Sequence, residues 1–320
     1  MKEIVKFGMC ADVHCDLAPD AVDRLRTFID EMNRVHPDFI IQLGDFCRPR
    51  EKNRPFVDVW NSFTGPKFHV IGNHDNESSS TEKAGVIKTY SYDEVLGFWG
   101  AAIKERYYSF DYKGWHFVVL HGSEEVENDF YKTPDYQAGY RFVKKEQRRW
   151  LASDLDTTDF PTILFIHEYP DIDTPGGLKG GFYTRRILEM ANEKVGFQKV
   201  RAVFTGHHHM DYMNIINGIY YVGINSMSFQ WLGADYRTER IPHYSKEDYQ
   251  KYGNFDCCLP YREPIWGIIS ILDNGEIRLK GRKTTLIPPT PSDMRLDEFW
   301  DLDYAYPVVP WVSDRLIPAP

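Results

Sequence analysis

Short apolar runs alternate with longer amphipathic stretches along the first two hundred residues. Runs typical of buried strands lie at 4–10, 39–43, 67–71, 162–166 and 200–205, and the pattern over 107–120 predicts a hairpin. The stretch 20–35 repeats apolar residues at helical spacing, and helices are also expected over 147–155 and 182–192. Strands that alternate with helices predict a layered α/β architecture.

The pattern changes after residue 225. Residues 229–262 are rich in Tyr, Trp and charge without a clear period, and a hairpin is expected over 265–280. The sequence therefore predicts a core over 1–224 and an aromatic, Pro-rich extension over 225–320 that completes the sheet and packs on the core. Two interpretations of the aromatic residues around Trp231 stay open. They form a lid that stacks a base or sugar, or they bury area and make a dimer contact.

Charge and composition exclude several classes of function. The 320 residues carry a formal net charge of −9, which argues against broad electrostatic binding of nucleic acid or anionic lipid. The first ten residues alternate charged and apolar side chains, unlike a signal peptide. No run approaches the ~18 apolar residues of a membrane span, and the five cysteines form no CxxC pattern. We expect a cytoplasmic protein without a membrane partner.

Polar clusters follow five of the expected strands. The clusters are Asp12-Val13-His14, Gly44-Asp45, Gly72-Asn73-His74-Asp75, His167 and Gly206-His207-His208-His209. In open α/β sheets, ligands bind outside the carboxyl ends of strands. Carboxylate, amide and imidazole donors without thiolates suit divalent Mn, Fe, Zn or Ni. The donors suffice for two ions, and a bridging carboxylate such as Asp45 would hold them about 3.5–4 Å apart.

These residues, in this order and strand context, resemble the five motifs of the calcineurin-like metallophosphoesterases. The resemblance covers residues 4 to about 224. It implies a four-layer α/β/β/α sandwich of two mixed sheets with flanking helices, and a catalytic domain over 1–224. It implies that a metal-bridging hydroxide attacks phosphorus in line, without a phosphoenzyme. It also implies that His74 acts as general acid or transition-state stabiliser and is oriented by Asp75.

The resemblance implies two sets of metal ligands that share Asp45. The first metal is assigned Asp12, His14, Asp45 and His209, and the second is assigned Asp45, Asn73, His167 and His207.

Departures from the family pattern disfavour two branches of the family. Phosphoprotein phosphatases carry GDxxDRG and GNHE, but here Arg48 stands where the second Asp is expected and Asp75 replaces the Glu. Purple acid phosphatases place a metal-binding Tyr at the position of Arg48. The sequence then resembles the small-substrate branch, which includes class III cyclic-nucleotide phosphodiesterases and manganese-dependent ADP-ribose/CDP-alcohol diphosphatases.

The expected function is hydrolysis of a small, nucleotide-like phosphodiester. The alternatives are a phosphomonoesterase and a nucleoside-diphosphate-linkage pyrophosphatase, because all three use the same attack on phosphorus. A non-catalytic scaffold of the same fold is disfavoured, since every expected ligand and His74 are present.

Three further residues are candidate substrate contacts. Arg48 could bind a phosphate oxygen through its guanidinium, Asn76 could donate to substrate, and His208 lies between two expected ligands. Strand-like alternation would turn His208 away from them. A homo-oligomer formed through the aromatic extension is a further hypothesis.

Overall fold

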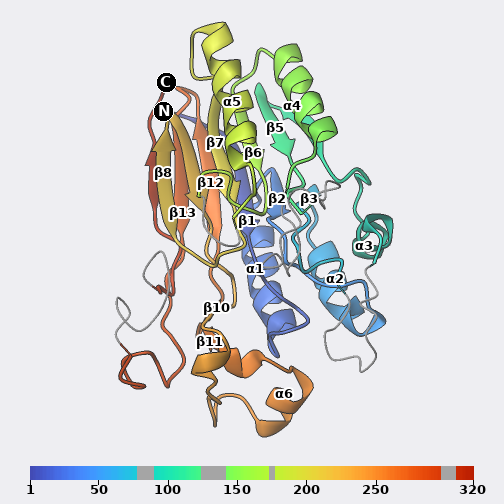
Figure 1. Cartoon of the computed structure of the whole chain (residues 1–320), viewed down its shortest axis with the longest axis vertical. Helices are drawn as coiled ribbons and strands as arrows, with labels where there is room; N and C mark the ends of the chain where they lie inside the picture. Colours follow the sequence, from blue (N-terminus) through green and yellow to red (C-terminus); the bar gives the residue numbers. More distant parts are fainter. Residues whose placement is uncertain (78–89, 124–141, 173–176, 297–307) are drawn as a thin grey trace.

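The computed structural model describes residues 1–77, 90–123, 142–172, 177–296 and 308–320 (Figure 1). Within these residues the chain forms two six-stranded sheets and one two-stranded sheet. Helices cover the outer faces of the two larger sheets, so the layers run helix, sheet, sheet, helix (Figure 1). The predicted α/β/β/α sandwich of two mixed sheets is confirmed.

The first sheet contains strands from both ends of the chain. Its order is β14–β13–β12–β1–β2–β3, with β1, β2 and β3 parallel and the remaining pairs antiparallel. Its strands are β1 (Glu3–Cys10), β2 (Phe39–Gln42), β3 (Lys67–His69), β12 (Gly267–Leu272), β13 (Ile277–Gly281) and β14 (Arg315–Ile317). The hairpin of the extension therefore joins this sheet through the pairing of β12 with β1. The division of the chain at residue 224 stays a prediction.

The second sheet comes from the middle of the chain. Its order is β4–β5–β6–β7–β9–β8, in which β5, β6, β7 and β9 are parallel and the two end strands are antiparallel to their neighbours. Its strands are β4 (Tyr108–Tyr112), β5 (Trp115–Val119), β6 (Thr162–Phe165), β7 (Val200–Thr205), β8 (Tyr212–Ile216) and β9 (Ile219–Gly223). The hairpin of β8 and β9 was not predicted from the sequence.

Six α-helices lie in the described part of the chain. They are α1 (Ala21–Val35), α2 (Arg54–Asn61), α3 (Tyr92–Trp99), α4 (Lys145–Thr157), α5 (Gly181–Val195) and α6 (Lys246–Lys251). The sequence predicted α1, α4 and α5 but not α2, α3 or α6. None of the helices among the described residues is both long and apolar enough to cross a membrane.

Alternate apolar side chains along the strands fill the space between the two sheets. In β1, Val5, Phe7 and Met9 face the second sheet, where Phe7 meets Phe117 and Phe165 edge to face at 5.9 and 5.8 Å between ring centroids. Because successive strand residues point to opposite faces, the other side of each sheet is left for helices. α1, α2 and α3 cover the first sheet, and α4 and α5 cover the second.

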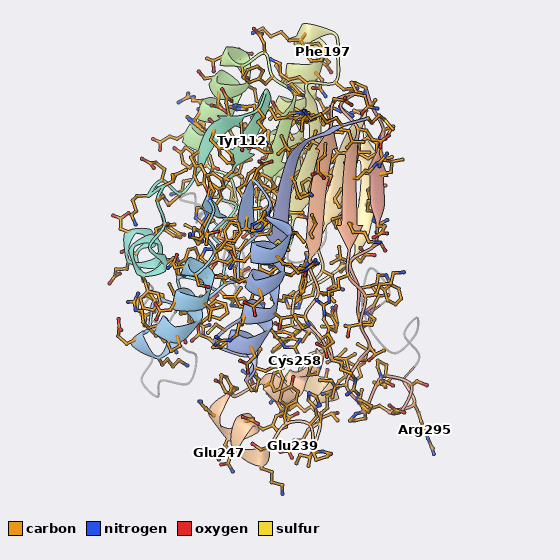
Figure 2. The ribbon with its side chains drawn as sticks, turned by 180° about the vertical axis from the view of Figure 1, so that it is seen from behind. Tyr112, Phe197, Glu239, Glu247, Cys258 and Arg295 are labelled. Atoms are coloured by element: carbon orange, nitrogen blue, oxygen red, sulfur yellow. The ribbon has the colours of Figure 1, made fainter. Side chains whose placement is uncertain are left out.

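A small lobe, residues 229–260, extends beyond the ends of the sheets next to α1. It contains β10 (Phe229–Trp231), β11 (Cys258–Pro260) and α6, and Figures 1 and 2 show it at one end of the molecule. Buried Arg24 of α1 anchors the lobe, since its guanidinium donates to the Tyr244 hydroxyl at 3.3 Å and to the Tyr261 carbonyl at 2.5 Å. Residues 297–307 of the extension lie outside the described residues.

Candidate metal centre

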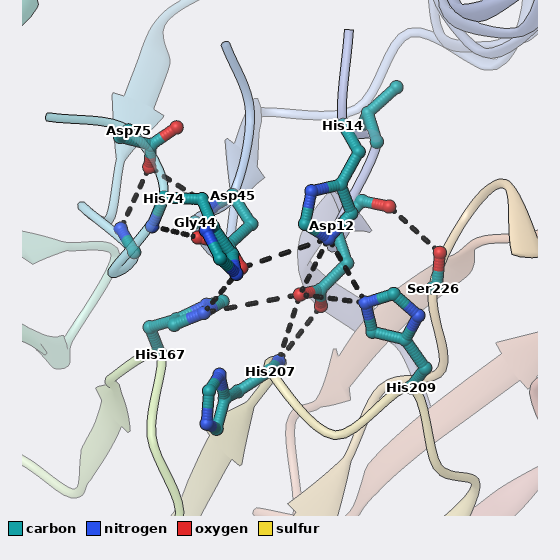
Figure 3. Close-up of polar contacts among 12 residues, drawn as sticks. Asp12, His14, Gly44, Asp45, His74, Asp75, His167, His207, His209 and Ser226 are labelled. Carbon is teal, nitrogen blue, oxygen red and sulfur yellow. Dashed lines mark hydrogen bonds and ion pairs between the residues drawn. The ribbon is translucent and has the colours of Figure 1, made fainter. Parts of the chain in front are cut away.

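The seven expected ligands all follow parallel strands. Asp12 and His14 follow β1, Asp45 follows β2, and Asn73 follows β3. From the second sheet, His167 follows β6, and His207 and His209 follow β7. Because the sheets are stacked, these strand ends meet at one edge, and Figure 3 shows six of the side chains around a common centre.

The donor atoms form two groups, and within each group they lie within 4.8 Å of one another. The groups are Asp12 with His14 and His209, and Asp45 with His167 and His207. Asp45 Oδ2 lies 3.2 Å from His167 Nε2 in its own group and 3.7 Å from His14 Nε2 in the other. Asp45 therefore stands between the groups, at the place that a bridging carboxylate would occupy.

Hydrogen bonds fix how two of the histidines present their rings. His167 Nδ1 lies 2.7 Å from the Leu43 carbonyl, and His209 Nδ1 lies 2.8 Å from the Phe229 carbonyl. Since a carbonyl oxygen only accepts, both Nδ1 atoms carry the proton and donate, and each Nε2 faces the carboxylates. The Nε2 atoms of His14 and His209 also face each other at 3.1 Å. Imidazoles oriented in this way are suited to share a cation.

The charges at this edge favour a positive charge between the carboxylates. Burial opposes the protonated form of His167, but the carboxylates of Asp45 and Asp12 outweigh burial and raise its pKa to about 10. Burial also opposes ionisation of Asp45, yet the neighbouring histidines hold the pKa of its carboxyl well below the usual range. The field that stabilises a proton here would equally stabilise a bound divalent cation.

The local backbone is unusual where the ligands stand. Asp12, His14, Asp45, His207 and His209 all have φ between 50° and 73°. This left-handed region is uncommon for residues other than glycine, and such conformations cluster at functional sites. Two glycines allow the close approach of the ligand loops. A Cβ on Gly44 would meet His167 Nδ1 at 2.5 Å, and one on Gly72 would meet the Asp45 backbone nitrogen at 2.4 Å.

Asn73 supplies a second, independent test of the fit to a metal. Its Oδ1 atom is buried and has no hydrogen-bond partner among the residues that the structure describes. A buried amide oxygen left in this way costs free energy, and coordination of a cation would satisfy it. Together with the two donor groups, this atom fits the ligand set expected for two divalent ions.

Asp75 does not make the contact with His74 that the resemblance implied. Its carboxylate accepts hydrogen bonds from the backbone N–H groups of Gly72, Asp45, Phe46 and Cys47, at 2.7 to 3.1 Å. It therefore ties the loop after β2 to the loop after β3 (Figure 3). These bonds hold the backbone that carries Asp45, and the expected orienting role of Asp75 toward His74 stays a prediction without a direct contact to support it.

Glu77 takes the position that was expected of Asp75. Its Oε2 atom lies 2.6 Å from His74 Nδ1, and Arg48 Nη2 approaches the same oxygen at 3.4 Å. The His74 side chain is 46% exposed, so its ring stands at the open side of the centre. Sequence reasoning missed Glu77, although its place three residues after His74 in a turn was an available signal.

The centre opens into a cavity of about 650 Å³. The cavity reaches from His14, Asp45 and His74 to Trp231 and Lys251 of the lobe. Arg48 and His208 line it, in agreement with their candidacy as substrate contacts, whereas Asn76 is not among its described lining residues. The ring of His208 stacks on Tyr169 at 4.8 Å between centroids.

The aromatic residues of the extension divide between the two hypotheses made for them. Phe229 is 1% exposed, and its ring lies 5.3 Å from that of His14 at an interplanar angle of 30°. Tyr244 is also buried, whereas Trp231 is 40% exposed and faces the cavity. Phe229 and Tyr244 therefore bury area, whereas Trp231 is exposed enough to contact a ligand.

Stacked α/β sheets with two neighbouring groups of carboxylate and imidazole donors at one edge are suited to a hydrolase that uses two metal ions. The family model of the calcineurin-like phosphoesterases matches residues 5–211. The chain belongs to this family and is a metal-dependent phosphoesterase.

This chain is similar to several solved structures of low sequence identity, and the first of these shows the shared fold. A dimetal phosphatase from Danio rerio is 15% identical and superposes with a TM-score of 0.60, covering 89% of this chain and 99% of that chain. The protein TT1561 of Thermus thermophilus is 14% identical with a TM-score of 0.46, over 70% and 90% of the two chains. An archaeal phosphodiesterase is 11% identical with a TM-score of 0.38, over 87% and 99%. No curated protein sequence matches this chain.

Proposed function

We propose that this phosphoesterase hydrolyses a small, nucleotide-like phosphodiester with the help of two divalent metal ions. The observation that carries the proposal is the pair of donor groups around Asp45, which opens into a cavity of about 650 Å³. This volume is within the range of about 300–1,000 Å³ for pockets that enclose small-molecule ligands. Manganese and iron, like Zn and Ni, accept these donors.

The bound ions would activate water and hold the phosphate for in-line attack. The chain's own residues do the remaining work. His74 stands at the open side of the centre, where its Nε2 can hold a proton for the leaving oxygen while Nδ1 contacts Glu77. Arg48 lines the cavity beside Glu77 and can donate to a phosphate oxygen.

Hydrolysis of bis-p-nitrophenyl phosphate beside p-nitrophenyl phosphate tests this proposal. The measurement uses metal-stripped protein to which manganese is returned, with iron, zinc and nickel in parallel. We expect a higher kcat/KM for the diester. Preference for the monoester would replace the proposal by a phosphomonoesterase. Cleavage of neither substrate by protein that holds two metals would overturn the phosphodiesterase and direct the search to diphosphate linkages.

A further inference from the structure

The cavity extends well beyond the residues that could hold the metals. One part of its lining, the loop wall, comes from the loop that follows Asp45 and from Asp16, and another part, the lobe wall, comes from the lobe with Trp231, Lys251 and Asn254. A phosphoryl group at the metal centre needs only the end of such a cavity. The remainder of the space is therefore available to the rest of the substrate, and its walls indicate the chemistry of that part.

The loop wall is built to present cations. Asp16, whose side chain is 9% exposed, accepts hydrogen bonds from the Arg48 backbone N–H at 2.8 Å and from Asn53 Nδ2 at 3.0 Å. Arg50 Nη1 and Lys52 Nζ lie 3.8 and 3.5 Å from its other oxygen. Neither distance is that of a hydrogen bond. Asp16 thus holds both cations at the wall while leaving their N–H groups able to donate to an acceptor in the cavity.

The charge of the cavity lining outside the metal centre is opposite in sign to that of the whole chain. The protein has a net charge of −9, yet four cationic side chains line the cavity against two carboxylates, apart from the metal-ligand candidates and buried Asp75. The cations are Arg48, Arg50, Lys52 and Lys251, and the carboxylates are Asp16 and Glu77. A cationic wall in an acidic protein attracts and orients an anionic ligand.

The lobe wall contributes an exposed aromatic side chain, that of Trp231. Trp231 is 40% exposed, and its side chain lines the cavity. Its strand, β10, pairs with β11, with Trp231 opposite Cys258, so the side chain projects from a fixed backbone. Aromatic side chains of this kind stack on the faces of planar rings.

We propose that this part of the cavity is a subsite for a second anionic group of the substrate, bound by Arg50 and Lys52, with a planar ring stacked on Trp231. The substrate class is then a nucleotide that carries an anionic group besides the phosphoester that is cleaved. This inference rests on the proposed function for the position of the scissile phosphorus. The subsite itself consists of residues outside the metal centre.

Calorimetric binding of two nucleotides to the manganese-loaded full-length protein tests the subsite. The probes are adenosine 5′-monophosphate and adenosine 3′,5′-bisphosphate, recovered afterwards to verify that they are intact. Wild-type protein is expected to bind the bisphosphate at least about 10-fold more tightly, because its second phosphate gains charge-assisted hydrogen bonds. The double variant R50A/K52A is expected to lose this ratio.

A matched control is R26A/K194A, which removes one Arg and one Lys from exposed ion pairs with Asp23 and Asp156, outside the cavity. It should keep the wild-type ratio. W231A should weaken both nucleotides by roughly 10-fold and leave the affinity for inorganic phosphate as in wild type. Equal affinity of wild type for the two nucleotides, no binding of either, or an unchanged ratio in R50A/K52A would overturn the subsite.

The two proposals can fail separately. Binding of the bisphosphate does not require hydrolysis, so protein that shows the affinity ratio but cleaves no diester would retain the subsite and lose the proposed function. Protein that cleaves diesters but binds the two nucleotides equally would retain the proposed function and lose the subsite.

Discussion

Asp45 is the side chain on which both donor groups depend. One carboxylate oxygen lies between His167 and His14, and the other accepts the His74 backbone N–H at 2.8 Å. Asp12 lies farther from the same two rings, at 3.9 Å from both His14 Nε2 and His167 Nε2, and its two oxygens share the His207 backbone N–H. The geometry thus favours Asp45 as the bridging carboxylate, and this role stays a prediction.

The variant D45N should lose metal as well as activity. An amide presents only one oxygen and carries no charge, so it cannot bridge two cations, and we expect metal affinity to fall by more than about 100-fold. Metal content by mass spectrometry and diester hydrolysis are the two measurements. D38N is a matched control, because Asp38 pairs with Lys113 outside the centre. Two metals and normal turnover in D45N would remove Asp45 from the bridging position.

His74 and Glu77 form a pair at the open side of the same centre. The 2.6 Å contact joins Nδ1 to a carboxylate, and the ring also lies 5.6 Å from that of His14. Such a contact fixes which way the ring faces and stabilises its protonated form. Glu77 is therefore a positioning residue that acts through His74.

A double-mutant cycle tests this pair. With a substrate that has a poor leaving group, H74A should lose about 10²–10⁴-fold in kcat, and E77Q should lose roughly 10-fold, while both keep their metals. If Glu77 acts through His74, H74A/E77Q should be no slower than H74A. E51Q, an exposed Glu paired with Arg54, is the control. Independent losses that multiply in the double variant would contradict this relation.

At the scale of elements, the strands of the core were predictable because burial on both faces makes them continuous apolar runs. The missed elements carry different signals. Helix α3 begins with a capping box of Ser91 and Glu94 and ends at Gly100, with φ of 69°. The β8–β9 hairpin turns at Asn217-Gly218, where both residues have positive φ. These are local turn and cap signals, and the periodicity of apolar residues does not reveal them.

The convergence of the candidate metal ligands could be predicted for a related reason. Each candidate follows the carboxyl end of a strand, and five of these strand ends meet at one edge of the stacked sheets. This convergence does not depend on the conformation of the loops. The partner of His74 depends instead on how one turn directs two side chains, and the sequence does not determine this. The cationic wall likewise depends on Asp16. Its carboxylate accepts a hydrogen bond from the backbone N–H of Arg48, which lies 32 residues later in the sequence. Long-range contacts of this kind require the folded structure.

His116 of β5 contacts both β4 and helix α4, and these contacts lead us to expect that stability depends on pH. It lies on β5 with Nδ1 2.6 Å from Asp111 of β4 and Nε2 2.9 Å from Asp154 of α4. Burial opposes its protonation, but the hydrogen bonds and charges of Asp154 and Asp111 outweigh burial and raise its pKa. The stabilisation is complete below the pKa of an unfolded histidine, about 6.5, and is lost as pH rises through the raised pKa.

The variant H116Q should therefore be destabilised more at pH 6 than at pH 9, by about 1–2 kcal/mol between the two. Urea unfolding of wild type and variant at both pH values measures this difference. The variant H243Q, whose histidine lies exposed in the lobe, serves as control and should show no such trend. If H116Q lowers the free energy of unfolding equally at both pH values, the protonated form of His116 does not provide the stabilising contacts with Asp111 and Asp154.

At the scale of the whole molecule, the metal centre depends on both ends of the chain. β12 pairs with β1 from Glu3 to Met9, directly before Asp12. The Ser226 and Ser228 hydroxyls donate to the carbonyls of Asp12 and Val13 at 2.8 and 3.0 Å, and the Phe229 carbonyl accepts from His209. The first 224 residues contain every candidate ligand, but residues beyond them hold the ligand loops in place.

A fragment of residues 1–224 should consequently fail to form the centre. Without β12, strand β1 becomes an unpaired, apolar edge that favours aggregation, and the carbonyls of Asp12 and Val13 lose their donors. We expect insoluble protein, or soluble protein that binds less than one metal per chain, as measured by sedimentation and metal analysis. Co-expression of residues 225–320 should restore solubility and metal content, because β12 would pair with β1 from a separate chain. If the fragment alone held two metals, the extension would be an addition to a self-sufficient domain rather than part of the fold that positions the site.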